Sequence, residues 1–144
     1  MQYLEVKNWN FEEKITPNFT VGELVRSYEA YKHKLYVQYM FRQDVYDYFH
    51  LLCGELLQPL RDEIEAPVRV TSGYRCKALN SIVGGAENSL HMLGLAADVQ
   101  VYQMNDKVAS ILSGFRYHEL IVYPTFVHVS IKENWNGQRF IDKR

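Results

Sequence analysis

The chain has 144 residues, which is enough for one domain with a packed core and too few for two. Hydrophobic residues make up 47% of it and the formal net charge is −1, so we expect a folded protein with no electrostatic footprint for nucleic acid or anionic lipid. No window approaches the roughly 18 apolar residues of a membrane span, and the first residues lack the basic flank and apolar run of a secretory signal, so we expect cytoplasmic synthesis and no membrane span.

The first half of the chain predicts helices. Thr20 and Glu23 have the spacing of a capping box, which predicts that a short helix begins there. From Val45 onward, apolar residues recur at intervals of three and four, which predicts a long core helix that Pro59 should kink or end. Cys53 falls on the apolar face of this helix, and two cysteines make neither a disulfide framework nor a zinc ribbon, so we expect a buried free thiol.

The second half predicts a sheet. Val68 and Val70 alternate with polar residues in a short strand that ends at Gly73, and residues 80–89 have the glycines and polar residues of an exposed loop. A buried strand over 95–101, a helix that Asn105 or Asp106 caps and that runs through Leu112, and an antiparallel hairpin over 119–131 are expected next. Helices followed by a mostly antiparallel sheet indicate the α+β class.

Two histidines and an aspartate stand out as candidate metal ligands. His91 precedes a glycine turn, Asp98 lies among the alanines and valines of a predicted buried strand, and His128 lies in the middle of another strand. An unpaired carboxylate in apolar surroundings is costly, and metal coordination is one of the few compensations. Two imidazoles and a carboxylate, with one position open, are a ligand set of catalytic zinc. On spacing alone, two core histidines and a hydrogen-bonded aspartate explain the pattern equally well.

A resemblance to a known family favours the metal site. "TSGYRCKALN", "SLHMLGLAADV" and "FVHVSI" follow one another in the order and spacing of the zinc D-Ala-D-Ala carboxypeptidases, and "NFTVGELVRS" and "LLQPLRDEI" resemble the helical lead-in of their small bacterial and phage members. The resemblance covers residues 18–131 of one domain, with a lead-in segment over 1–17 and a C-terminal tail over 132–144. It implies a hedgehog-like α+β fold, one Zn²⁺ held by His91, Asp98 and His128, and peptidoglycan peptides as substrate.

The resemblance also implies roles for two residues near the metal. Arg75 matches an arginine that approaches the substrate carboxylate or the developing oxyanion, a task that suits a planar bidentate cation. A structural ion pair is the alternative for Arg75. Ser89 matches a residue that hydrogen-bonds the substrate or orients the site, and it could equally be a turn serine.

The sequence departs from the family where the general base is expected. Many members carry an acid three residues before the second histidine, and here that position is Thr125. Glu119 is our candidate instead, because pairing Val122 with Val127 in the hairpin makes Glu119 and His128 diagonal neighbours on one face, with Cβ atoms at most about 7–8 Å apart. A register shift of one residue would turn Glu119 to the other face and leave His118 as the candidate.

These patterns together predict a zinc peptidase that cleaves peptidoglycan stem peptides or cross-links, as a D,D-carboxypeptidase or as an endopeptidase. Cytoplasmic synthesis then fits a phage or prophage lysin, released through a membrane lesion or carried in a virion. A zinc-binding but inactive relative that serves as a wall-binding or virion structural domain is the alternative, which the missing acid at Thr125 keeps open. A peptidase for free D,D-dipeptide is a further alternative, and a monomer is the default for either activity.

Overall fold

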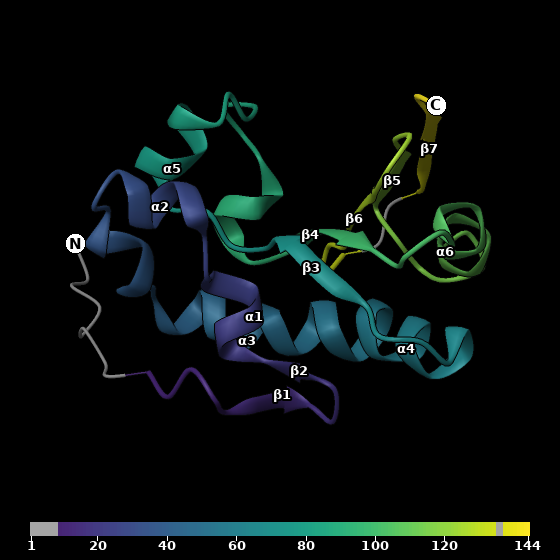
Figure 1. The fold of residues 1–144 in the computed structure, drawn as a ribbon, viewed down its shortest axis with the longest axis horizontal. Helices are drawn as coiled ribbons and strands as arrows, with labels where there is room; N and C mark the ends of the chain where they lie inside the picture. Colours follow the sequence, from purple (N-terminus) through teal and green to yellow (C-terminus); the bar gives the residue numbers. More distant parts are fainter. Residues whose placement is uncertain (1–8, 135–136) are drawn as a thin grey trace.

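The sheet in the second half of the chain orders its strands β3-β4-β6-β5-β7. Their bounds are β3 (Arg69–Ser72), β4 (Ala96–Gln100), β5 (Glu119–Val122), β6 (Val127–Ser130) and β7 (Arg139–Asp142). All neighbouring strands are antiparallel except β5 and β7, which are parallel. The computed structural model describes residues 9–134 and 137–144. Its helices precede and flank this sheet, which confirms the predicted α+β fold (Figure 1).

The predicted core helix runs from Gln43 to Ile64 without interruption. It consists of α3 (Gln43–Leu52), a π-helical turn η2 (Cys53–Leu57) and α4 (Gln58–Ile64). The helix continues through Pro59, so the prediction that this proline ends the helix is wrong. A proline inside a helix clashes with the carbonyl four residues earlier. The wider π turn ends just before Pro59, and such turns accommodate a local break in the regular bonding pattern.

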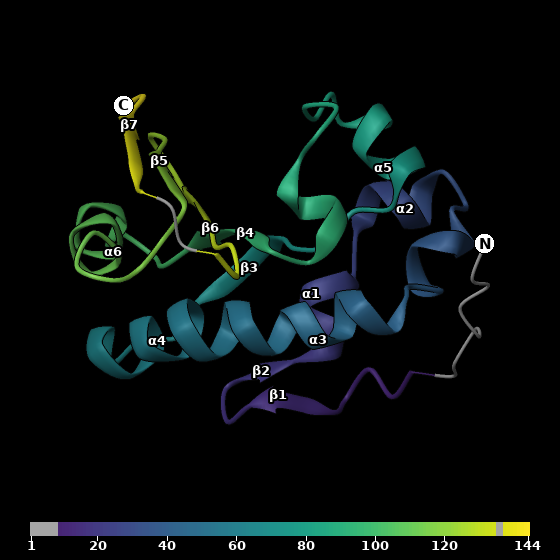
Figure 2. The ribbon, with the colours of Figure 1, turned by 180° about the vertical axis from the view of Figure 1, so that it is seen from behind.

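This long helix lies against one face of the sheet and forms the core with it (Figures 1 and 2). Phe49, Leu52 and Leu56 are completely buried on the helix, at the predicted spacing, and Cys53 is a buried free thiol as expected. The sheet contributes alternate residues to the same cluster, among them Val99, Val127 and Val129. The opposite face of these strands is therefore left for the polar residues that alternate with them.

The segment before the long helix covers its other side and one end of the sheet. It contains a small hairpin of β1 (Lys14–Thr16) and β2 (Phe19–Thr20), then α1 (Val21–Val25), α2 (Tyr28–Lys32) and η1 (Tyr36–Tyr39). The predicted capping box is confirmed: the Glu23 amide donates to Thr20 Oγ1 at 3.2 Å, and the Thr20 amide donates to the Glu23 carboxylate at 3.3 Å. The first eight residues of the predicted lead-in segment lie outside the described residues.

The connections between the strands differ from the predictions in two places. Residues 80–82 end the helix α5 (Lys77–Ile82) rather than begin a loop, and a turn of 3₁₀ helix, η3 (Leu90–Leu93), precedes β4. The helix α6 (Asn105–Leu112) forms as expected, but Met104 is its N-cap and no side chain caps it. The side-chain Nδ2 of Asn105 donates instead to the Tyr123 carbonyl at 2.6 Å. Within the described residues, the structure has no helix that is both long and apolar enough to cross a membrane.

Candidate metal centre

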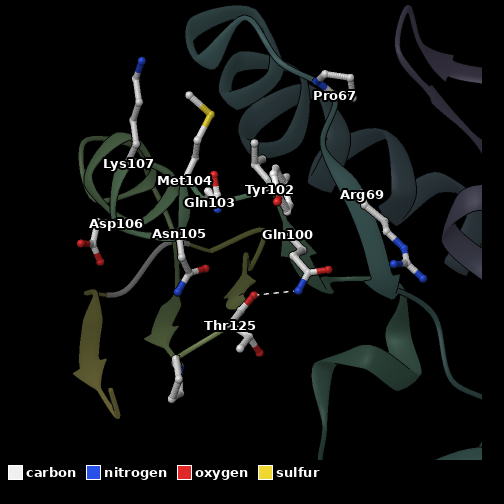
Figure 3. A pocket seen from close by; sticks show the side chains of 12 residues that line it. Pro67, Arg69, Gln100, Tyr102, Gln103, Met104, Asn105, Asp106, Lys107 and Thr125 are labelled. Atoms are coloured by element: carbon white, nitrogen blue, oxygen red, sulfur yellow. Dashed lines mark hydrogen bonds between the residues drawn. The ribbon is translucent and has the colours of Figure 1, made fainter.

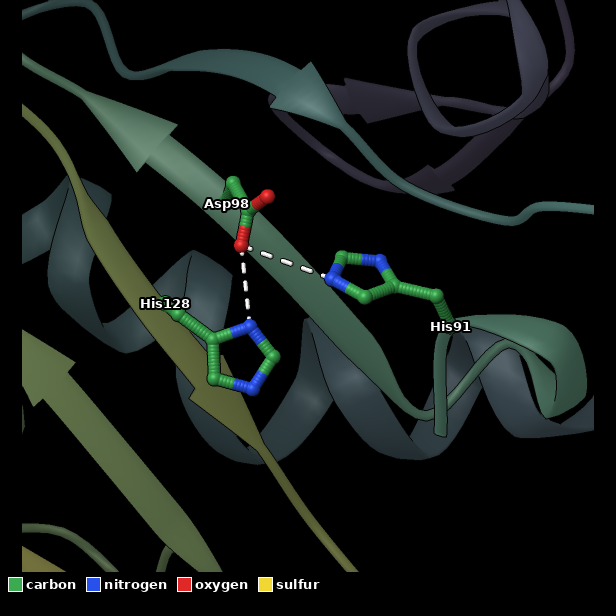
Figure 4. Close-up of side chains that lie close together, drawn as sticks. All are labelled: His91, Asp98 and His128. Atoms are coloured by element: carbon green, nitrogen blue, oxygen red, sulfur yellow. Dashed lines mark hydrogen bonds and ion pairs between the residues drawn. The ribbon is translucent and has the colours of Figure 1, made fainter. Parts of the chain in front are cut away.

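The three candidate ligands meet on the polar face of the sheet. Asp98 of β4 and His128 of β6 are directly opposite each other, which brings His128 Nδ1 to 2.9 Å from Asp98 Oδ1. His91 on η3 reaches the same oxygen with its Nε2 at 3.4 Å (Figure 4). Each residue offers one ligand atom, and these atoms lie within 4.8 Å of one another. The structure therefore brings together the set that the sequence analysis singled out.

The backbone around His91 fixes which of its nitrogens faces the site. His91 Nδ1 lies 2.7 Å from the Gly73 carbonyl, and because a carbonyl only accepts, Nδ1 carries the proton and Nε2 keeps its lone pair. Such a hydrogen bond is typical of metal-binding histidines. The η3 turn that carries His91 ends at Gly94 with φ +79°, a conformation that favours glycine. Sequence and backbone together thus aim one imidazole nitrogen at Asp98.

The donor set fits a zinc ion. Bonds of 2.0–2.2 Å in tetrahedral geometry place neighbouring ligand atoms about 3.3–3.6 Å apart. The candidate ligand atom of Asp98 lies 3.4 Å from that of His91 and 2.9 Å from that of His128, and all three lie within 4.8 Å of one another, so small shifts would fit them around one ion. Burial alone would raise the pKa of Asp98, but the neighbouring His128 and His91 side chains hold it well below its usual range. Asp98 is therefore ionised at neutral pH, as a ligand must be.

Arg75 lies at the edge of this cluster, in the loop after β3. Its Nη2 is 3.5 Å from Asp98 Oδ2, its Nε donates to Ser72 Oγ at 3.1 Å, and its Nη1 donates to Asn80 Oδ1 at 3.3 Å. Burial lowers the pKa of Arg75 and the charge of Asp98 opposes this shift. The guanidinium is held on three sides, so the structural ion pair and a role toward substrate are compatible.

Glu119 lies where the predicted hairpin register requires. The structure pairs Glu119 with Ser130 and Ile121 with His128, which confirms the register. Glu119 Oε1 is 3.7 Å from His128 Nε2, and its other oxygen is 3.8 Å from Nη1 of Arg139 on β7. The carboxylate is partly buried and faces the ligand cluster. His118, the alternative, lines the same cavity with a pKa lowered by burial and by Lys132.

The cluster opens into a cavity of about 560 Å³, here called the metal pocket. The three ligands, Arg75, Ser89 and Glu119 all line it. Ser89 Oγ also accepts the His91 amide hydrogen at 3.2 Å and caps η3, so the turn role is present in the structure.

Thr125 lies at a different cavity. It lines a pocket of about 990 Å³ beside α6, here called the α6 pocket, where its carbonyl accepts a hydrogen bond from Gln100 at 2.9 Å (Figure 3). The position that carries the acid in many relatives is thus not among the residues that line the metal pocket here.

Three further residues shape the metal pocket and escaped the sequence analysis. Asn80 is buried and joins Arg75 to the loop that follows, because its Nδ2 donates to the Ala86 carbonyl at 2.9 Å. Arg139 comes from the predicted C-terminal tail, which forms β7 at the edge of the sheet. Ser130 is buried with its hydroxyl unpaired among the described residues. Asn80 had one signal, the adjacent "SGYR" motif, whereas the other two depend on strand pairing.

Comparison with known proteins agrees with this geometry. The model of the family described as Peptidase M15 matches residues 17–130. No curated protein matches the chain.

Proposed function

The chain belongs to the peptidase M15 family, and from this premise we propose that it is a zinc peptidase that hydrolyses an amide bond in peptidoglycan stem peptides or cross-links. The observation that carries the proposal is the convergence of His91, Asp98 and His128 with the carboxylate of Glu119, which lies 3.7 Å from His128. Family membership supports metallopeptidase chemistry in general. The zinc ion and the wall substrate are the finer part of the proposal.

His91, Asp98 and His128 would hold the zinc ion. When bound, it would lower the pKa of a water molecule to about 7 and would polarise the scissile carbonyl. Glu119 accepts the proton of the attacking water and later donates it to the leaving amine, as a general base and then a general acid.

Arg75 acts on the other side of the ligand cluster. Its N–H groups are fixed by Ser72, Asn80 and Asp98, so they are oriented before substrate arrives. A guanidinium in this position stabilises the negative charge that develops on the carbonyl oxygen, or binds a terminal carboxylate of the peptide.

The test is mass spectrometry of purified peptidoglycan after incubation with the zinc-loaded protein. We expect new stem-peptide fragments from the parent, none from His128→Ala, and a loss of about 10²- to 10⁴-fold in rate for Glu119→Gln with zinc content unchanged. Glu63→Gln on the exposed side of α4 is the matched control and should cleave like the parent.

Each outcome distinguishes the parts of the proposal. Fragments that persist in Glu119→Gln would keep the peptidase and remove Glu119 as the base. Zinc binding by the parent without fragments from any wall type would favour the inactive wall-binding or virion domain. Release of D-alanine from free dipeptide, with no cleavage of wall, would favour the dipeptidase alternative.

A further inference from the structure

A second cavity lies directly beside the metal pocket. It has a volume of about 650 Å³ and is here called the α2 pocket, because β3 forms one wall and α2 forms the other. Arg75 and Val83 line both cavities, so the two adjoin at these residues. In both ribbon views, α2 and α5 lie on one side of strands β3 and β4, and β5 and β7 lie on the other side (Figures 1 and 2). A chain bound at the metal centre can therefore extend past Arg75 into the α2 pocket.

The charges around the α2 pocket are mostly positive. Arg26, Arg69 and Arg75 line it, and Glu29 is its one acidic lining residue. Arg75 is already occupied by Asp98, and the Glu29 carboxylate lies 3.7 Å from His33. The net charge of these groups stays positive after Glu29 and Asp98 are both counted.

Arg26 and Arg69 are the basic lining residues that remain available, because both are exposed and no acidic group of the described residues pairs with either. Arg69 lies on β3, the wall opposite α2, and its partner on β4 is the neutral Gln100. Arg69 also lines the α6 pocket, and in Figure 3 its guanidinium points away from Gln100 and Thr125. An unpaired guanidinium at a pocket wall is suited to bind a carboxylate through paired N–H donors.

The wall opposite Arg69 is aromatic. Tyr28 and Tyr31 line the pocket and are 74% and 78% exposed, so their rings offer uncovered apolar surface with a hydroxyl at the tip. Aromatic rings of this kind pack against the aliphatic parts of a peptide while their hydroxyls stay hydrated. The α2 pocket thus combines an anion-binding group with apolar walls.

We propose that the α2 pocket binds a carboxylate of the substrate peptide away from the bond that is cleaved, and that Arg69 is the residue that recognises it. The inference rests on the proposed function and specifies its substrate: an acidic peptide rather than any peptide. Stem peptides of peptidoglycan carry such carboxylates on their branches, and some walls carry the same groups as amides. Arg69 would make the protein prefer the carboxylate form.

The experiment uses pairs of soluble disaccharide-pentapeptides, each ending in D-Ala-D-Ala, that differ only in one group: isoglutamate or isoglutamine in one pair, and the free or amidated branch carboxyl of diaminopimelate in the other. Binding is measured by NMR titration or calorimetry, and cleavage is measured separately as kcat/KM. For at least one pair, we expect the parent to bind the carboxylate form about three- to tenfold more tightly, a preference that weakens as salt rises.

Two variants test the assignment to Arg69. Arg69→Gln should bind both members of that pair equally and fold normally, because the side chain is exposed. Lys107→Gln removes an exposed positive charge from the α6 pocket and should keep the parent's preference. An Arg69→Gln protein that still prefers the carboxylate, or a parent that prefers it in neither pair, overturns the inference.

The binding measurement separates this inference from the proposed function. Carboxylate preference that depends on Arg69, without cleavage of these peptides or of whole cross-linked peptidoglycan, would support the subsite and reject the peptidase. Cleavage that is equal for the parent and Arg69→Gln on all four peptides would support the peptidase and reject the subsite. A parent that binds none of the four peptides would overturn both.

Discussion

Replacing Gly73 by alanine tests whether the backbone contact between β3 and α1 orients the metal ligand His91. A Cβ at Gly73 would lie 2.3 Å from the Leu24 carbonyl oxygen and 2.9 Å from its carbon, and both atoms are backbone. No rotamer change relieves such a contact, so the two segments must separate by about 1 Å to reach an ordinary van der Waals distance. The Gly73 carbonyl that holds His91 Nδ1 would move with them.

The cost follows from the bonds at this point. Separation breaks the 2.7 Å hydrogen bond from the Tyr74 amide to the Leu24 carbonyl, which is worth about 1 kcal/mol, and the displaced backbone adds about 1–3 kcal/mol. We therefore expect Gly73→Ala to lower the free energy of unfolding by about 2–4 kcal/mol. Loss of the histidine's supporting hydrogen bond should weaken zinc binding by about 10- to 100-fold.

Urea denaturation of the metal-free protein and calorimetric titration with zinc measure the two effects. Gly54→Ala is the control, because Gly54 is exposed in the helix and a Cβ there meets nothing within 4 Å. That change should stabilise the protein by about 0.5–1 kcal/mol and leave zinc affinity unchanged. A Gly73→Ala protein that binds zinc as tightly as the parent would refute the reasoning.

Three other perturbations act near the same site. Gly85→Ala would place a Cβ 2.0 Å from Asn80 Oδ1 and displace the side-chain amide that supports Arg75. We expect kcat/KM to fall about 10- to 100-fold, while the zinc content, measured by mass spectrometry, stays at one ion per chain. Ser130→Ala removes a buried hydroxyl with no partner among the described residues, so unfolding in urea should show equal stability or a gain of about 1 kcal/mol, and a loss larger than that would contradict this view. Acid should release zinc, because protons compete with the metal for its ligand atoms, although the lowered pKa of Asp98 keeps that ligand charged to low pH; full zinc retention at pH 4 in metal analysis would contradict this expectation.

Local signals predicted much of the site, and their success has a physical reason. A strand turns successive side chains to opposite faces, so the apolar neighbours of Asp98 and His128 show that these two residues face away from the core. The short Tyr-Pro-Thr turn fixes how β5 and β6 pair, and that register places Glu119 beside His128. Each inference needed only residues that are close in the sequence.

Features that depend on distant segments were out of reach. Gly73 contacts Leu24, which lies in a distant segment of the chain, and the sequence around neither residue indicates this contact. The pairing of β7 with β5 is parallel and connects a segment that reads as a polar tail. Pro59 misled for a different reason: the rule that proline ends a helix assumes regular hydrogen bonding, and the π turn before it changes that pattern.

Glu119 offers a carboxylate at the proposed metal site, although position 125, where the resemblance implies an acid, is a threonine. A residue in the β5–β6 turn is positioned by the turn alone, whereas Glu119 is fixed by pairing on both sides, with Ser130 of β6 and Arg139 of β7. The ion pair with Arg139 holds one oxygen and leaves the other toward His128. Since Arg139 lies beyond the residues that match the family, 17–130, the edge strand contacts a lining residue of the pocket from outside the part of the chain that family resemblance covers. If Glu119 is the base, its orientation depends on β7, and Arg139→Gln should lower kcat without changing zinc content.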